Sequence, residues 1–268
     1  MTVPFPTQAT AITPNMPGLS AGPVQAQVWQ QTAANSFTLI GSAAVTVNDT
    51  RNGVSITPAS IDLATPPATF TITGTGFANL GFGLPVVNFM SGTTLIAQAR
   101  ATALSGSTTL TVPFPTQATA ITASLPGLSA GSVQAQVWQQ TGSSTFSLLT
   151  TVTLSVADAR RVDGITPASI SLAAPPATFA ITGIGFSDLG YGLPVVNFMR
   201  GTTLLAQARA MALTGSTTLT VLFPTQATAI TPNLPGLSAG PVQAQVWRQV
   251  TPGSFTLIGS ANLTVTTP

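Results

Sequence analysis

The sequence predicts an all-β protein made of tandem β-sandwiches, with about seven antiparallel strands in each repeat. The first observation is a repeat, because Trp29, Trp138 and Trp247 recur at a spacing of 109 residues. The second is the alternation of apolar and polar side chains over short segments, which is typical of strands with one buried face. The third is that Gly and Pro interrupt every apolar stretch, which favours short strands and turns. A repeat of this length is typical of a sandwich domain rather than of a solenoid unit.

The expected strands can be followed along the first repeat. Residues 24–28 alternate between apolar and polar side chains, and in residues 37–47 the odd positions are mostly apolar, which predicts one buried face. The same alternation continues through residues 70–73, 95–100 and 110–114. No segment has the 3.6-residue period of an amphipathic helix. We therefore expect two antiparallel sheets that pack face to face.

Two kinds of block alternate within the repeat. The first kind begins with TV(P/L)FPTQATAIT at Thr2, Thr111 and Thr220, and the second kind contains ITPAS at Ile56 and Ile165. The order is first, second, first, second, first. Three blocks of one kind cannot pair with two of the other, so one first-type block is left without a partner.

The unit that begins with the second block resembles the IPT/TIG type of immunoglobulin-like domain in four short motifs. They are I-T-P at 56–58, I-T-G-T-G-F at 72–77, V-N-F at 87–89 and T-T-L-T-V-P at 108–113. The first three have counterparts at 165–167, 181–186 and 196–198. The resemblance implies an immunoglobulin-like β-sandwich. In that family such modules serve DNA-binding factors, cell-surface receptors, carbohydrate-active enzymes and bacterial surface proteins.

Taking the I-T-P motif as the start of a domain divides the chain into three parts. Residues 54–162 and 163–268 are expected to be complete immunoglobulin-like domains, and residues 1–53 the C-terminal half of a further one. A few strands with an apolar face and no partner sheet are expected to be unstable in water. Two interpretations follow: the chain is a piece of a longer tandem array, or another subunit completes the half-domain.

The composition excludes most chemistry. The chain has seven Arg and five Asp but no Lys, Glu, His or Cys, so charged residues make up only 4% of it. Zinc, copper, haem and iron–sulfur sites need imidazole or thiolate ligands, and general acid–base catalysis has only Asp and one Tyr to use. We therefore expect no enzyme, no metal site and no cofactor. A net charge of +2 without a basic cluster argues against nucleic-acid binding, and no stretch predicts a membrane-spanning helix.

Half of the charged residues fall at the proposed domain junctions. One interpretation is a charged hinge that fixes the angle between domains, with or without a cation; the other, which we favour, is a solvated linker. By contrast, Arg100 and Arg209 lie in the strands, where we expect them to be solvated or to be cross-strand partners. The inter-domain linker residues are Asp49, Arg51, Asp158, Arg160, Arg161 and Asp163.

The tryptophans form the candidate interaction face. Val24, Ala26 and Val28 share the apolar parity of their strand, so Trp29 is expected on the opposite, outward face with the glutamines. An exposed Trp among Gln residues could stack on a sugar or anchor a protein contact. The alternative, which we favour, is a packing role, for example where a bulge turns the indole inward. The candidate residues are Trp29, Trp138, Trp247, Gln27, Gln136 and Gln245.

The leading functional hypothesis is a non-enzymatic structural protein, forming a stalk, fibre, filament or sheath outside a bacterial cell. Sheets that carry almost no charge lack the repulsion that keeps proteins apart, so we expect self-association into a homo-oligomer or fibre. The expected location is extracellular or on the cell surface, with any signal peptide outside this chain. The alternative is an adhesin or carbohydrate-binding module that binds glycans through the Trp and Gln face.

Overall fold

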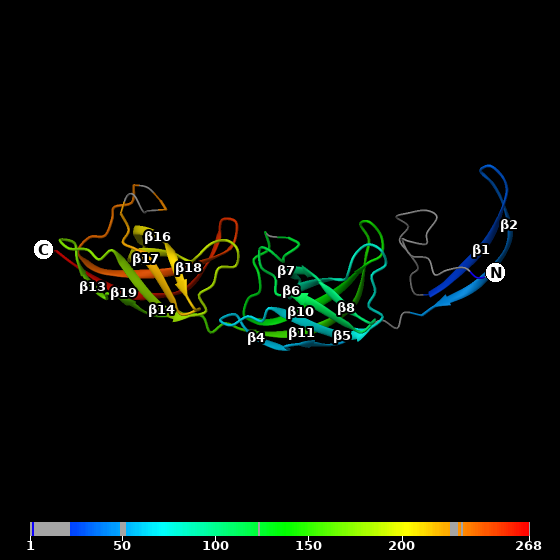
Figure 1. The fold of residues 1–268 in the computed structure, drawn as a ribbon, viewed down its shortest axis with the longest axis horizontal. Helices are drawn as coiled ribbons and strands as arrows, with labels where there is room; N and C mark the ends of the chain where they lie inside the picture. The colour runs from blue at the N-terminus through cyan, green and yellow to red at the C-terminus, as the bar shows by residue number, and fades with distance from the viewer. Residues whose placement is uncertain are drawn as a thin grey trace.

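The computed structural model of the chain describes residues 2, 22–48, 52–122, 124–225, 230–231 and 233–267. Within these residues the regular secondary structure is strand only, and no helix is long and apolar enough to cross a membrane. A two-stranded hairpin and two β-sandwiches follow one another along the chain (Figure 1). We refer to them as the hairpin (22–47), the first sandwich (52–157) and the second sandwich (161–266).

The hairpin consists of β1 (Gly22–Ala33) and β2 (Ser36–Val47), which pair antiparallel. Asn35 has a φ of 61° at the tight turn between them, a left-handed conformation that Asn tolerates better than most residues. The pairing is regular from Gly22 to Val28 and then shifts between Val28 and Trp29.

The first sandwich has a four-stranded and a five-stranded sheet. The four-stranded sheet has the order β3 (Asn52–Thr57), β5 (Thr69–Thr75), β9 (Thr109–Pro113), β8 (Ala103–Ser105). The five-stranded sheet has the order β4 (Ser60–Asp62), β11 (Phe146–Ala157), β10 (Gly131–Gln140), β6 (Val86–Ser91), β7 (Thr94–Arg100). The I-T-P motif ends β3, since Pro lacks the N–H that would continue the ladder, and the chain then crosses to the other sheet.

The second sandwich repeats this arrangement with one strand fewer, because β16 runs without a break through both sheets. Its strands are β12 (Arg161–Thr166), β13 (Ser169–Ser171), β14 (Thr178–Ile184), β15 (Val195–Arg200), β16 (Thr203–Thr214), β17 (Thr218–Leu222), β18 (Gly240–Thr251) and β19 (Ser254–Thr266). Strand β16 replaces the separate β7 and β8 of the first sandwich.

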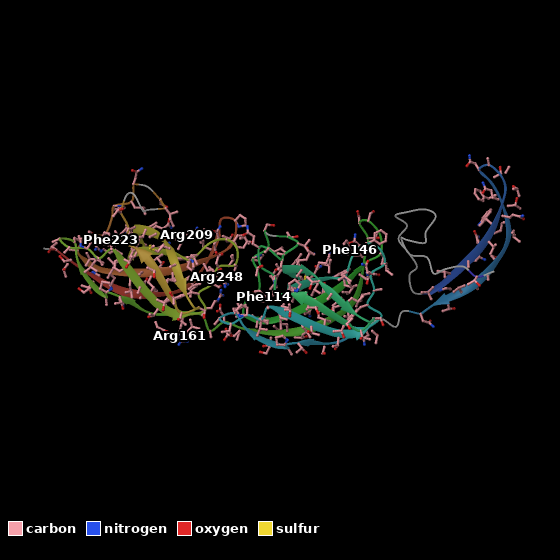
Figure 2. All side chains as sticks on the ribbon, viewed as in Figure 1. Phe114, Phe146, Arg161, Arg209, Phe223 and Arg248 are labelled. Carbon is pink, nitrogen blue, oxygen red and sulfur yellow. The ribbon has the colours of Figure 1, made fainter. Side chains whose placement is uncertain are left out.

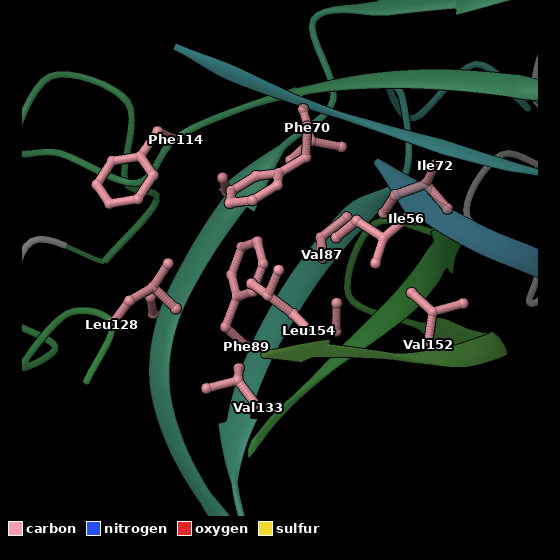
Figure 3. Close-up of a cluster of buried hydrophobic side chains, with 14 of the residues drawn as sticks. Ile56, Phe70, Ile72, Val87, Phe89, Phe114, Leu128, Val133, Val152 and Leu154 are labelled. Carbon is pink, nitrogen blue, oxygen red and sulfur yellow. The ribbon is translucent and has the colours of Figure 1, made fainter. Parts of the chain in front are cut away.

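Each sandwich has its own hydrophobic core, built by the inward positions of the alternating strands. In the first core Phe70 packs on Phe89 with ring centroids 5.5 Å apart, and both rings are fully buried (Figure 3). Phe179 and Phe198 repeat this contact at 5.5 Å in the second core. The prediction of an all-β, immunoglobulin-like sandwich fold is confirmed.

Candidate interaction face

Each candidate tryptophan lies on the outward face of its strand and is held by the glutamine two residues before it. The indole Nε1 of Trp29 donates a hydrogen bond to Oε1 of Gln27 at 3.2 Å. Trp138 and Trp247 make the same bond to Gln136 and Gln245, both at 3.3 Å. Residues i and i+2 of a strand point to one face, which is why the repeated Q-x-W sequence produces this pair.

A bulge beside the tryptophan explains why it stays outward. In the first sandwich Val137 pairs with Thr150 but Trp138 pairs with Leu148, so Leu149 has no cross-strand partner. The extra residue therefore lies in β11, and the parity of β10 is unchanged. Leu149 instead packs against the core.

The bulge also turns the side chains that precede it in β11 to the opposite face of the sheet. Our expectation that the odd positions of residues 37–47 share one buried face is wrong for Phe37 and Leu39. Their counterparts in the first sandwich, Phe146 and Leu148, are each 44% exposed, while the inward positions after the bulge are buried. An added residue moves every side chain on one side of it to the opposite face.

Trp138 and the exposed side chains of Leu148 and Phe146 lie on the outward face of β10 and β11, and we call them the outer patch. Trp138 is half-buried, and it pairs directly with Leu148 across the strands. The second sandwich repeats the patch with Trp247, Leu257 and Phe255. An outward apolar group of this kind is a candidate interaction surface. Sequence reasoning located the tryptophans but missed their Leu and Phe partners, because the bulge has no composition signal of its own.

Polar side chains form a row next to the outer patch. Strand pairing places Gln136, Asn88 and Gln98 side by side across β10, β6 and β7. Nε2 of Gln98 donates to Oδ1 of Asn88 at 2.7 Å, and the hydroxyl of Thr122 donates to Oε1 of Gln98 at 3.2 Å. Gln207, Asn197 and Thr231 repeat these bonds in the second sandwich. The row is therefore largely satisfied by its own members.

The two strand arginines are structural. Nη1 of Arg100 donates to the carbonyl of Leu84 at 2.6 Å, and Nη2 donates to Oε1 of Gln140 at 3.2 Å. A side chain at Gly83, where φ is +102°, would lie within 2.8 Å of that guanidinium, so the loop needs glycine there. Arg209 makes equivalent bonds to Leu193 and Gln249 in the second sandwich, so both arginines bind a loop carbonyl and a glutamine two strands away.

The described linker charges pair over short distances. Arg160 donates to both carboxylate oxygens of Asp158, and Arg161 Nε lies 2.7 Å from Oδ1 of Asp163. The hydrogen bonds from Arg160 hold the pKa of Asp158 below its usual value. Backbone N–H groups of Ala64 and Ala159 lower the pKa of Asp62 in the same way. Two further predicted linker residues, Asp49 and Arg51, lie outside the described residues.

Arg160 does not behave as part of a solvated linker. Its side chain is only 5% exposed, so the interpretation that we favoured from the sequence is wrong for this residue. For Arg161 and Asp163, which are 56% and 46% exposed, a solvated position is observed. Nη1 of Arg160 is buried without a hydrogen-bond partner among the described residues.

The two sandwiches meet at Arg160. A side chain at Gly185 of the second sandwich would lie within 2.7 Å of Ala64 and 2.5 Å of Arg160, so the two backbones approach closely there. The N–H of Gln117 donates to the carbonyl of Leu189 at 3.1 Å across the same joint. Leu63, Phe114 and Tyr191 help to line a small pocket at the joint, together with Arg248. Figure 2 labels Phe114 and Arg248 on the two sides of this joint. Arg248 is 5% exposed and donates to Ser187 at 3.3 Å.

No group of three metal-ligating side chains occurs within the part of the chain that the structure describes. The four described aspartates are occupied locally: Asp62 and Asp188 accept backbone N–H groups, and Asp158 and Asp163 pair with arginines.

No protein-family model matches the sequence, and a search of curated proteins finds no relative. Several solved structures are distantly similar. One is SGBP-B of the Bacteroides ovatus mixed-linkage glucan utilization locus, solved in complex with a mixed-linkage heptasaccharide. It is 15% identical to this chain, with a TM-score of 0.25, and the match covers 93% of this chain and 54% of that one. Invasin, a bacterial integrin-binding protein, is 15% identical with a TM-score of 0.25, over 93% of this chain and 46% of that one.

The mouse nectin-like molecule 4 ectodomain, with domains Ig1–Ig3, is 13% identical with a TM-score of 0.21, over 89% of this chain and 72% of that one. The chain thus spans about half the length of the first two proteins.

Proposed function

We propose that the chain is a non-enzymatic structural protein of IPT/TIG-type immunoglobulin-like modules, which works outside a bacterial cell as a stalk, fibre or sheath. The observation that carries this proposal is the joint between the sandwiches. Only residues 158–160 separate β11 from β12, and the side chain of Arg160 is buried within the joint. Bending at the joint would expose that side chain and break the hydrogen bond from Gln117 to Leu189. The three-residue linker and the arginine side chain buried between the sandwiches limit bending, which supports a stiff rod.

The chemistry of the described residues supports a structural role over a catalytic one. Each described aspartate already accepts backbone N–H groups or pairs with an arginine, so none is poised as a general acid or base. The remaining surface is rich in Thr, Ser and Gln and carries little charge. Such a surface favours packing against copies of itself.

Stiffness can be measured with spin labels, because the chain has no native Cys. Labels on Ser107→Cys and Thr214→Cys, both at exposed positions, report the distance between the two sandwiches. We expect one narrow distance distribution. Gly185→Ala should broaden it, because the new Cβ would collide with Ala64, whereas Gly201→Ala, with a similar positive φ and open space around it, should not. A broad distribution in the chain that carries only the labels would contradict a stiff rod.

Self-association is tested separately by sedimentation velocity over a concentration series, with electron microscopy of the most concentrated sample. We expect oligomers or fibres that grow with concentration. A chain that stays a dispersed monomer throughout would overturn the fibre-forming part of the proposal.

A second candidate function is adhesion to glycans through the outer patch. It is favoured by one observation: a half-buried Trp lies between exposed apolar neighbours and a Gln and Asn row in both sandwiches. Aromatic faces stack on sugar rings, and neighbouring amides can bind their hydroxyls. On a glycan array, the double variant Trp138→Ala, Trp247→Ala should lose all binding, while Met211→Ala, 57% exposed elsewhere, should retain it. Absence of binding by the unsubstituted chain would remove this candidate.

A further inference from the structure

The hairpin has an apolar face that nothing in the described structure covers. Val28 and Val45 are 38% and 44% exposed, whereas their counterparts Val137 and Leu154 in the first sandwich are fully buried. Both sandwiches have residues equivalent to this whole face, and in each sandwich these residues belong to the hydrophobic core. We call this set the inner face of the hairpin, and it consists of Val24, Ala26, Val28, Ala43, Val45 and Val47.

The hairpin already has the geometry that its counterparts have in a complete sandwich. Gly22 pairs with Val47 as Gly131 pairs with Val156, and both hairpins shift register at the position before the tryptophan. The hairpin therefore needs no rearrangement to accept the elements that its counterparts contact.

Those elements form what we call a front half, residues 52–113 in the first sandwich and 161–222 in the second. In the first sandwich β6 pairs with β10 and β4 pairs with β11. In the second, β15 pairs with β18 and β13 pairs with β19. Both front halves are thus occupied, and within the described residues β1 and β2 pair only with each other (Figure 1).

We propose that the inner face of the hairpin is an acceptor site for a front half of one more copy of this repeat. The pairing in both sandwiches fixes the register: a V-V-N-F-M strand lies antiparallel to residues 25–29, with its Met opposite Gln25 and its first Val opposite Trp29. A short strand that begins with Ser-Ile lies parallel to residues 46–48. The proposal rests on the proposed role as a repeat-built structural protein.

The chemistry of the site favours this occupant. Residues 22–47 contain no charged side chain, so recognition depends on apolar burial and on main-chain hydrogen bonds along the outer edges of β1 and β2. A second copy of the chain offers no unoccupied front half, because its own two are filled as well. Contact between two hairpins through their inner faces is therefore the competing arrangement.

The test extends the full chain before residue 1 with a copy of residues 54–109, so that the 109-residue spacing continues. Amide hydrogen exchange is then compared at residues 24–28 in the extended and unextended chains. Docking should slow exchange there by at least about 100-fold, because these amides gain partners and a buried face. Val28→Asp should abolish the slowing, since it places a charge where Val137 is fully buried.

A matched control carries the same extension with Phe89→Asp in the copied segment, which should not dock. Equal exchange in the extended and unextended chains would overturn the proposal. So would protection that rises with the concentration of the unextended chain and disappears with Val28→Asp, because the inner face would then bind a second hairpin. The spin-label distance across residues 158–160 does not involve the hairpin, so the rod proposal stands or fails separately.

Discussion

The hairpin and strands β10–β11 are two copies of the same repeat segment in two different situations. Both form the same antiparallel pair with the same bulge, yet Val28 is 38% exposed and Val137 is fully buried. The local pairing is therefore encoded in the hairpin itself, through alternation and the tight turn. Burial is not, because it depends on a second sheet that the front half supplies. The segment alone therefore specifies its strand pairing, and burial of its apolar face requires the second sheet.

The largest expected effect comes from shortening one inward-facing side chain in the first sandwich and comparing it with its counterpart in the hairpin. Leu154→Ala removes a fully buried side chain and should lower the free energy of unfolding of the first sandwich by about 2–5 kcal/mol. The matched change Val45→Ala, at a position 44% exposed in the hairpin, should change stability by less than about 0.5 kcal/mol. Urea denaturation followed by circular dichroism measures both.

Leu263→Ala, at the equivalent position of the second sandwich, serves as the control, since its side chain is 1% exposed. It should resemble Leu154→Ala in size. A cost for Val45→Ala as large as that for Leu154→Ala would mean that the inner face of the hairpin is already covered in solution.

A smaller effect is expected at the joint, which joins two complete sandwiches. Asp158→Asn leaves the guanidinium of Arg160, 5% exposed, without its carboxylate. The cost should be about 1–2 kcal/mol, less than for a fully buried pair, because Asp158 itself is 30% exposed. Denaturation with Asp163→Asn as the exposed control measures it. Equal, negligible changes in both variants would show that the joint adds nothing to stability.

The same carboxylates predict an acid-sensitive joint. The folded pKa values of Asp62 and Asp158 lie below the ordinary value of 3.8, so their stabilising effect is complete above that pH and is lost as the pH falls through the lower folded values. Because the chain has no His, Glu, Lys or Cys side chain, stability should be almost constant from about pH 5 to pH 9. Unfolding midpoints across the pH range test this, and a midpoint that falls steadily from pH 7 to pH 5 would contradict it.

The smallest effect concerns the Trp–Gln pair, which all three copies form. Gln136→Ala removes the hydrogen bond to a half-buried indole and should cost about 0.5–1 kcal/mol. Gln27→Ala should cost almost nothing, because Trp29 is 52% exposed and water replaces the partner. The difference in denaturation midpoint between the two variants is the measurement. A cost for Gln27→Ala as large as for Gln136→Ala would contradict this account of the pair.

Much of the fold follows from the sequence because alternation and turn residues act locally. The outward facing of Trp138 and its pairing with Gln136 follow from strand parity alone. The outer patch could not be predicted, because Leu149 adds one residue to β11 and so turns Leu148 and Phe146 outward. The burial of Arg160 could not be predicted either, since it depends on contacts between two domains rather than on neighbours in the chain.

We expect the hairpin to keep its strand pairing in solution while its inner face stays uncovered. Amide hydrogen exchange along the unextended full chain tests this directly, by comparing residues 24–28 with residues 133–137. We predict that the buried β10 segment exchanges at the rate of global unfolding of its sandwich, and that the hairpin segment exchanges at least about 100-fold faster. Equal protection of the two segments in a monomeric chain would contradict the account.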